Sequence, residues 1–121
     1  MEDTLRSGLL SVVLPSYNEE ASIPRAADTI TAILIDADIP HELVFVDDGS
    51  RDRTWTVIQE QAGRHPQVRG VRFSRNFGKE AAIFAGLAQA RGDCALVMDC
   101  DLQHPPEKAV EMYRLWREGY Q

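Results

Sequence analysis

The sequence predicts an α/β fold in which a mainly parallel, four-stranded sheet carries helices on both faces. Four short, mainly apolar runs, rich in valine and leucine, alternate with four segments whose apolar residues recur at helical spacing. Strands that are apolar throughout are typical of parallel sheets, because helices bury both faces of such a sheet. The expected element order is therefore βαβαβαβα, with right-handed crossovers.

The first half of the chain supplies two of the strands and the helix between them. LLSVVL at residues 9–14 predicts a buried strand that ends at Pro15, because proline cannot donate to a central ladder. Apolar residues at helical spacing predict a helix over 23–37 that ends before Pro40. The LVFV run at 43–46 then predicts a second buried strand.

The rest of the chain predicts further helices and strands in alternation, at residues 55–62, 68–73, 83–90, 94–98 and from Pro105 onwards. Ser50 or Asp52 could cap the first of these helices, and Gly92 should follow the end of the second. Two adjacent prolines suit the opening turn of the last helix. The expected buried face of that helix consists of Ala109, Met112, Tyr113 and Trp116.

Length and composition are those of one ordinary globular domain. The chain has 121 residues, of which 44% are hydrophobic and 26% charged, so we expect an N-terminal tail at 1–8 and one domain over 9–121. A net charge of −6 argues against a general nucleic-acid-binding protein. The sequence shows neither an apolar run of about 20 residues nor a signal-peptide pattern at its start, which predicts a cytoplasmic chain.

Cys94 and Cys100 lie at the two ends of the fourth predicted strand. An extended strand rises about 3.3 Å per residue and would separate them by about 20 Å, which is too far for a disulfide. We therefore expect two reduced cysteines that are partly buried.

A cluster of polar residues follows the carboxyl end of every predicted strand. The four clusters lie at residues 17–20, 47–50, 74–79 and 99–104. Ligands of open parallel sheets bind beyond the carboxyl ends of the strands. Connecting loops are often polar for solvation alone, but four clusters on one rim favour a binding site.

The cluster after the fourth strand has the chemistry of a divalent-metal site. Side chains alternate along a strand, so Asp99 and Asp101 should point the same way, and Gln103 can follow them. Carboxylate and amide oxygens suit Mg²⁺ or Mn²⁺, which usually keep waters and also bind substrate phosphates. The alternative is an acidic pair on a solvated loop.

The clusters after the first and second strands could hold a nucleotide. Tyr17 could stack on a base or pack as a half-buried ring, while Glu19 and Glu20 also suit the first turn of a helix. Asp47 and Asp48 should point in opposite directions, so that one contacts a ring N–H or a ribose hydroxyl and the other caps the next helix. No GxGxxG motif follows any of the strands, which argues against a dinucleotide fold.

The cluster after the third strand contributes positive charge. Arg75 and Lys79 lie on or beside a glycine-containing loop, where cations could meet a diphosphate. A basic loop that balances nearby acids is the alternative. Lys79 stands at a predicted helix start, where the helix dipole disfavours a cation, so its placement favours a functional role.

Taken in order, the motifs PSYNEE, VDDGS, RNFGKE and DCDLQHPPE resemble the inverting family 2 glycosyltransferases, which have a Rossmann-like GT-A fold. The resemblance is in particular to polyprenyl-phosphate glycosyltransferases related to dolichol-phosphate mannose synthase, and it spans residues 9–120. It implies a nucleotide site made of Pro15, Tyr17, Glu19, Asp47 or Asp48, Lys79 and Asp99. It also implies that the metal and the diphosphate are held by Asp99, Asp101 and Gln103.

The activity that this resemblance implies is metal-dependent transfer of a sugar from a UDP- or GDP-sugar to a polyprenyl phosphate, with inversion. Members of the family continue into a second half that holds the acceptor site and the catalytic base. We therefore expect this chain to carry the donor-binding half, with the acceptor base beyond Gln121. The full-length parent is expected at the cytoplasmic face of the membrane.

The sequence departs from the family at two positions, and a second hypothesis stays open. Cys100 stands where alanine is more usual, and His104 stands where the family often has aspartate but also histidine; neither change removes an expected ligand. The second hypothesis is a non-catalytic nucleotide-binding or protein-interaction module. In that case the unfinished edge of the sheet would bind a protein partner or form a homodimer.

Overall fold

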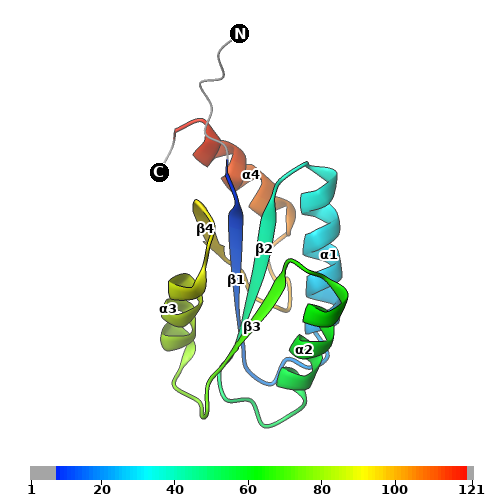
Figure 1. Cartoon of the computed structure of the whole chain (residues 1–121), viewed down its shortest axis with the longest axis vertical. Coiled ribbons are helices and arrows are strands. Elements are labelled where there is room, and N and C mark those ends of the chain that lie inside the picture. Colours follow the sequence, from blue (N-terminus) through cyan, green and yellow to red (C-terminus); the bar gives the residue numbers. More distant parts are fainter. Residues whose placement is uncertain (1–7, 120–121) are drawn as a thin grey trace.

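A computed structural model of the chain describes residues 8–119, which form strands and helices in strict alternation (Figure 1). The strands are β1 (Leu10–Ser16), β2 (His41–Asp47), β3 (Val68–Arg72) and β4 (Cys94–Val97). The helices are α1 (Ile23–Asp36), α2 (Thr54–Arg64), α3 (Lys79–Gln89) and α4 (Glu107–Arg117). This order confirms the predicted βαβαβαβα; the predicted tail lies, apart from Gly8, outside the described residues. None of the described helices is long and apolar enough to cross a membrane.

The sheet is parallel throughout, in the order β3-β2-β1-β4. The chain moves from β1 to β2 and β3 on one side, and α3 then carries it back to β4 on the other side of β1. Strand order therefore reverses between β1 and β4, which is where ligands of such sheets bind. Helices α1, α2 and α4 pack on one face of the sheet and α3 packs on the other, as predicted (Figure 1).

Strand β1 is longer than predicted, because it continues through Pro15 to Ser16. The Val13 carbonyl accepts the Met98 N–H on the β4 side, and alternation along the strand makes Pro15 face that side too. The ladder between β1 and β4 ends at the pair Val13–Val97, so in the described chain no paired strand lies opposite Pro15. Its missing N–H therefore breaks no ladder bond, and the expectation that Pro15 ends the strand is wrong.

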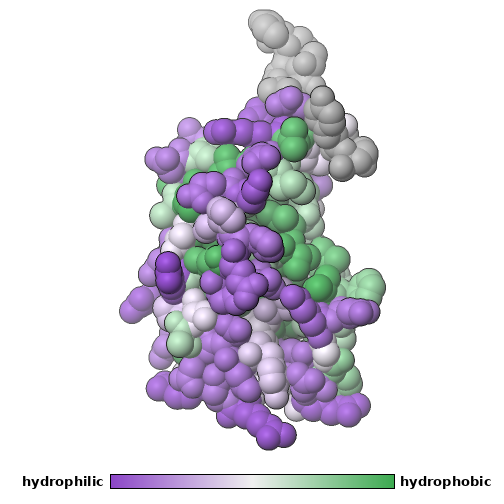
Figure 2. All heavy atoms as spheres, turned by 180° about the vertical axis from the view of Figure 1, so that it is seen from behind, coloured by the Kyte–Doolittle hydropathy of each residue, from purple (hydrophilic) through white to green (hydrophobic). Residues whose placement is uncertain are grey.

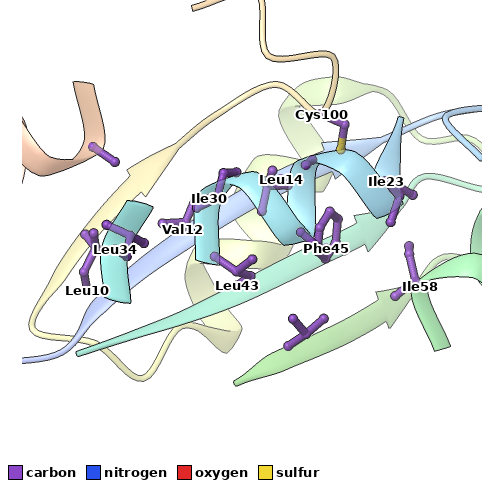
Figure 3. Close-up of a cluster of buried hydrophobic side chains, with 14 of the residues drawn as sticks. Leu10, Val12, Leu14, Ile23, Ile30, Leu34, Leu43, Phe45, Ile58 and Cys100 are labelled. Atoms are coloured by element: carbon purple, nitrogen blue, oxygen red, sulfur yellow. The ribbon is translucent and has the colours of Figure 1, made fainter. Parts of the chain in front are cut away.

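The core has two layers, one on each face of the sheet. The larger layer lies under α1, α2 and α4 and includes Leu10, Val12, Leu14, Ile30 and Phe45 (Figure 3). The smaller layer lies under α3 and consists of Val13, Val44, Val46 and Ala82. Neighbouring strand residues enter opposite layers because side chains alternate across a strand. Burial of both faces explains why the central strands β1 and β2 are largely apolar, whereas the edge strands β3 and β4 are only partly buried.

Helix α4 differs from the prediction at one residue, Met112. Ala109 and Tyr113 are buried and Trp116 packs against the core, but 51% of Met112 is exposed. The reason is that α4 lies over the edge of the sheet, where Met112 borders a groove along β4. Other exposed apolar side chains of α3, β4 and α4 are Phe84, Leu87, Val97 and Leu115. Figure 2 shows hydrophobic side chains exposed among polar ones on the rear face of the molecule.

Candidate functional site

A pocket of about 300 Å³ opens at the carboxyl ends of the strands, beside the point where strand order reverses. Its wall is made of Pro15, Ser16, Tyr17, Glu19, Asp48, Lys79, Asp99, Cys100, Asp101 and Gln103. Every residue that the family resemblance implied for the nucleotide or the metal lies on this wall, except Asp47. Arg75, which we expected beside Lys79 near a diphosphate, is also absent from the wall; its guanidinium lies 4.4 Å from the centre of the Phe77 ring. The structure therefore brings all four polar clusters to one site.

Asp47, the exception, is buried at the end of β2 and supports the turn that follows. Its Oδ1 accepts the Ser50 N–H at 2.9 Å, and its Oδ2 lies 4.0 Å from Arg72 Nε. The first residue of helix α2 donates to Asp52 instead: the Thr54 N–H lies 2.9 Å from Asp52 Oδ1. The expectation that one acid of the Asp-Asp pair caps α2 is wrong, because a whole turn separates this pair from the helix.

Asp48 lies on the pocket wall, yet its carboxylate is directed at the loop before α3. Its Oδ1 accepts the Phe77 N–H at 2.8 Å and the Gly78 N–H at 3.3 Å. Its Oδ2 accepts the Gly78 N–H at 3.1 Å and the Asn76 side-chain amide at 3.2 Å. One buried carboxylate therefore joins the end of β2 to the start of α3.

Lys79 is the first residue of α3, as predicted, and its side chain reaches across the pocket. Its Nζ lies 3.0 Å from Asp99 Oδ1. A cation at a helix N-terminus is unfavourable by itself, and the Asp99 carboxylate offsets that cost. The pocket therefore presents one ammonium group among several carboxylates.

The turn after β4 directs its side chains to two sides. Cys100 points inward (Figure 3), and its Sγ lies 3.0 Å from Ser16 Oγ, whereas Asp99 and Asp101 line the pocket. Burial raises the pKa of the Cys100 thiol to about 12; the Ser16 hydrogen bond opposes this rise, and nearby carboxylates add to it. Neither Cys94 nor Cys100 forms a disulfide, as predicted.

The residues available for a metal ion are Asp99, Asp101 and Gln103. Asp101 and Gln103 are exposed at the pocket, and Asp99 is half-buried. Within residues 8–119, no group of three or more His, Cys, Asp or Glu side chains could hold a metal ion by itself. Two carboxylates and an amide form an open, all-oxygen set, which fits Mg²⁺ or Mn²⁺ when waters and phosphate oxygens complete the coordination.

A second set of contacts, which the sequence analysis missed, joins the loops after β1 and β2. The Asn18 N–H donates to Ser50 Oγ at 2.8 Å, and Asn18 Oδ1 accepts the Arg51 N–H at 2.9 Å. The Glu19 N–H donates to Thr54 Oγ1 at 2.8 Å. Asn18 has a positive φ of 52°, a conformation that asparagine tolerates better than most residues. This preference is the only feature of the local sequence that indicates a turn at Asn18. These contacts hold in place the loop that carries Tyr17 and Glu19, whose side chains line the pocket.

Comparison with known proteins shows the family. The model of glycosyl transferase family 2 matches residues 11–121, and the chain belongs to this family of enzymes. One relative is the undecaprenyl-phosphate 4-deoxy-4-formamido-L-arabinose transferase of Pseudomonas aeruginosa (strain LESB58). It is 43% identical over 113 residues, which cover 93% of this chain and 33% of the relative. The chain spans about a third of the length of the curated relatives it matches.

Solved structures confirm the predicted GT-A type of α/β fold. A mannosyltransferase from Pyrobaculum calidifontis, in complex with GDP-Man and Mn²⁺, has a TM-score of 0.74 and 26% identity, over 93% of this chain and 34% of that one. TarS from S. aureus, in complex with UDP, has a TM-score of 0.62 and 28% identity, over 76% of this chain and 27% of that one.

Proposed function

We propose that the chain carries the donor-binding half of a metal-dependent, inverting glycosyltransferase that transfers a sugar from a UDP- or GDP-sugar to a polyprenyl phosphate. The observation that carries this proposal is the convergence of carboxylates, an amide and a lysine on one pocket at the switch point of the sheet. The comparisons support it: one relative is named for undecaprenyl phosphate, and two similar structures contain GDP-Man with Mn²⁺ or UDP.

The metal and the diphosphate would be held by Asp99, Asp101 and Gln103. When bound, Mg²⁺ or Mn²⁺ would offset the negative charge that develops on the departing nucleoside diphosphate. Lys79 would bring a second positive charge to the same group. The clustered acids explain why both cations are needed, since the carboxylates alone would repel a diphosphate.

The nucleoside would lie beside Pro15, Tyr17 and Glu19. The Tyr17 ring is 43% exposed, which leaves it accessible for stacking on a base. Of the two acids predicted to approach the base or ribose, Asp48 borders the pocket and Asp47 supports the neighbouring turn.

The complete reaction is proposed for a longer parent protein, because the chain covers a third of its relatives' length. The acceptor site and the catalytic base would lie beyond Gln121. The parent would work at the cytoplasmic face of a membrane, where a polyprenyl phosphate presents its head group.

Calorimetric titration with UDP and GDP, each with and without Mn²⁺, tests the donor site. We expect one of the nucleotides to bind and Mn²⁺ to tighten its binding. Asp101→Ala should remove the metal effect, whereas Glu111→Ala should keep it, because Glu111 is an exposed acid that pairs with Lys108 outside the pocket. Lack of metal-dependent binding to either nucleotide would overturn the proposal.

A second candidate function is binding of a protein partner, or of a second copy of the chain, at the edge of the sheet. The observation that favours it is the group of exposed apolar side chains around β4, which includes Val97 and Met112. Light scattering over a range of concentrations tests self-association. A dimer that dissociates in Val97→Lys would support it, and a strictly monomeric chain would exclude the homodimer.

A further inference from the structure

Cys100 lies between the two carboxylates proposed to hold a metal ion, but its own side chain is buried. The residue is 3% exposed and belongs to the larger core layer (Figure 3). Its neighbours Asp99 and Asp101 line the pocket and are more open to solvent. The turn after β4 therefore has one inward side chain between two that face the pocket.

The Cys100 thiol is linked to the end of β1 through hydrogen bonds. Its Sγ lies 3.0 Å from Ser16 Oγ, which itself donates to the Leu14 carbonyl at 3.0 Å. A hydroxyl has one proton, so while Ser16 donates to Leu14, the Cys100 S–H is the donor to Ser16. The Pro15 carbonyl lies 3.8 Å from the same sulfur. Because Cys100 and Ser16 are both buried, water does not replace these contacts.

This side-chain link lies just beyond the point where backbone pairing between β1 and β4 ends. The last ladder pair is Val13–Val97, and the Met98 N–H then donates to the Val13 carbonyl. In the part of the chain that the structure describes, residues 99–103 form no ladder with β1. The contact between Cys100 and Ser16 therefore fixes the turn where the ladder does not.

Leu102 gives independent evidence that the turn is held from the core side. It has a φ of 56°, a left-handed conformation that is unfavourable for leucine. Its N–H donates to the Asp99 carbonyl at 3.2 Å, and its side chain packs against the larger core layer. Such a conformation persists only where the surrounding structure fixes it. Cys100 and Leu102 thus anchor the turn to the same layer.

We propose that Cys100 is a positioning residue, which fixes the spacing of the Asp99 and Asp101 carboxylates through its hydrogen bond to Ser16. The proposal rests on the function proposed above and concerns the metal ion that this function requires. Two neighbouring carboxylates repel each other, and Mg²⁺ needs its oxygen ligands close to octahedral positions. A turn that is already fixed brings both carboxylates to the ion with little reorganisation.

The affinity for Mn²⁺ tests this role, measured by electron paramagnetic resonance of the free ion in the presence of UDP or GDP, whichever binds the wild-type chain. Ser16→Ala removes the acceptor and hardly changes the volume of the side chain, and Cys100→Ala removes the thiol. We expect each variant to bind Mn²⁺ about tenfold more weakly. The double variant should lose no more than about twofold beyond either single variant, because both changes break the same hydrogen bond.

Cys100→Ser separates the hydrogen bond from the filling of space. Serine is smaller than cysteine but keeps a donor on the same Cβ, so the affinity for Mn²⁺ should stay within about threefold of the wild-type value. A loss equal to that of Cys100→Ala would overturn the role of the hydrogen bond.

Ser11→Ala is the matched control for a loss of stability alone. Ser11 is also buried in β1, but its hydroxyl donates to Glu42 at 2.6 Å, at the end of the sheet opposite the pocket. This variant should lower the urea midpoint and leave the affinity for Mn²⁺ within about twofold. Reduced stability would then not explain the weaker binding in Ser16→Ala.

Hydrogen exchange of the metal-free chain tests the same link without a ligand. In Ser16→Ala, the Leu102 amide should exchange about tenfold faster, whereas the Met98 amide should change little, because it remains bonded to the Val13 carbonyl. Unchanged exchange at Leu102 would contradict the anchoring of the turn.

The outcomes for the two proposals can be told apart. An affinity for Mn²⁺ within about twofold of the wild-type value in both Ser16→Ala and Cys100→Ala, or additive losses in the double variant, would overturn the positioning role. Failure of the wild-type chain to bind either nucleotide with Mn²⁺ would instead overturn the proposed function.

Discussion

Lys79 and Asp99 form an ion pair across the pocket, with Lys79 Nζ 3.0 Å from Asp99 Oδ1. Both side chains are partly open to solvent, 63% for Lys79 and 34% for Asp99, so water and salt screen their attraction. Asp99 is also one of the two carboxylates proposed to hold a metal ion. If the metal binds as proposed, the Lys79 ammonium and the divalent cation would compete for the same carboxylate.

Replacing Lys79 with methionine should change the affinities for metal and for nucleotide in opposite directions. Without nucleotide, Lys79→Met should tighten Mn²⁺ binding about two- to fivefold, which is the size expected for an exposed ion pair. With Mn²⁺ present, the variant should bind UDP or GDP about tenfold more weakly, because a charge-assisted contact is lost. Calorimetry measures both affinities. Lys108→Met is the matched control, since Lys108 is also 63% exposed and pairs with Glu111 outside the pocket.

Cys100 should react slowly with thiol reagents as long as the chain is folded. Its pKa is raised from 9.0 to about 12, so at pH 8 its thiolate fraction is about a thousandfold lower than in the unfolded chain. Because the folded-state pKa is raised, the buried thiol stabilises the fold below pH 9, and this contribution is lost as the pH rises toward 12. Maleimide labelling of a Cys94→Ser variant, with and without urea, measures the difference. Comparable rates in both conditions would contradict the buried position.

Glu42 forms a buried network at the end of the sheet opposite the pocket. Its Oε2 accepts the Ser11 hydroxyl and the Arg91 N–H, both at 2.6 Å, and its Oε1 accepts Arg69 Nε at 3.0 Å. Burial alone would raise the pKa of Glu42, but the hydrogen bonds from Arg91, Ser11 and Arg69 and the Arg69 charge together lower it below 4.5. The ionised form is therefore favoured in the folded state.

Protonation of Glu42 should lower the free energy of unfolding in acid. Because its folded-state pKa is lowered, the network contributes fully above pH 4.5, and the contribution is lost as the pH falls through the folded-state pKa. Glu42→Gln should lower the free energy of unfolding at pH 7 by about 3 kcal/mol, since it breaks a buried charge pair. Urea titrations at several pH values should show wild type and variant converging below pH 4.5. Asp28→Asn, at an exposed carboxylate that contacts His65, should change stability by less than about 0.5 kcal/mol.

Two glycines in helices should respond to alanine with opposite signs. A Cβ on Gly86 of α3 would lie 2.3 Å from Val13 Cγ1, so Gly86→Ala should destabilise the chain by about 1–3 kcal/mol through overpacking against the sheet. A Cβ on Gly63 of α2 has nothing within 4 Å, and alanine there should stabilise by about 0.5–1 kcal/mol. Thermal and urea unfolding of both variants measure the two effects, and a neutral Gly86→Ala would contradict the close approach of α3.

The element order was predictable because each strand and helix carries its own local signal. Val12, Val13 and Leu14 form an apolar run that only a strand buried on both faces needs, and Ile23 to Leu34 repeat at helical spacing. Pro15 and Met112 were predicted wrongly for a common reason. Pro15 is tolerated because the pairing between β1 and β4 ends before it, and Met112 is exposed because it borders the free edge of β4. Neither fact can be read from the residues next to Pro15 or Met112 in the sequence.

The location of the site residues that directly follow a strand could be predicted from the sequence. The orientation of side chains that depends on contacts between residues far apart in the sequence could not. Tyr17, Asp99 and Asp101 reach the pocket because the strands before them end at one rim. The alternation of side chains along a strand predicts that Asp47 and Asp48 point in opposite directions. It does not predict which of the two carboxylates contacts the loop at residues 76–78. Neither does it reveal side-chain partners that are far apart in sequence, such as Ser16 and Cys100.

The position of Pro15 leaves one side of β1 without a partner strand near the pocket. β1 stays paired with β2 through residues 14–16, after its pairing with β4 has ended at Val13. The chain turns after β4, and its Cys100 side chain packs against Ser16 instead of continuing the ladder. A proline offers no N–H to a strand that approaches from that side, so backbone pairing cannot readily extend β4 further along β1. Pro15 thus keeps this end of β1 on the wall of the pocket.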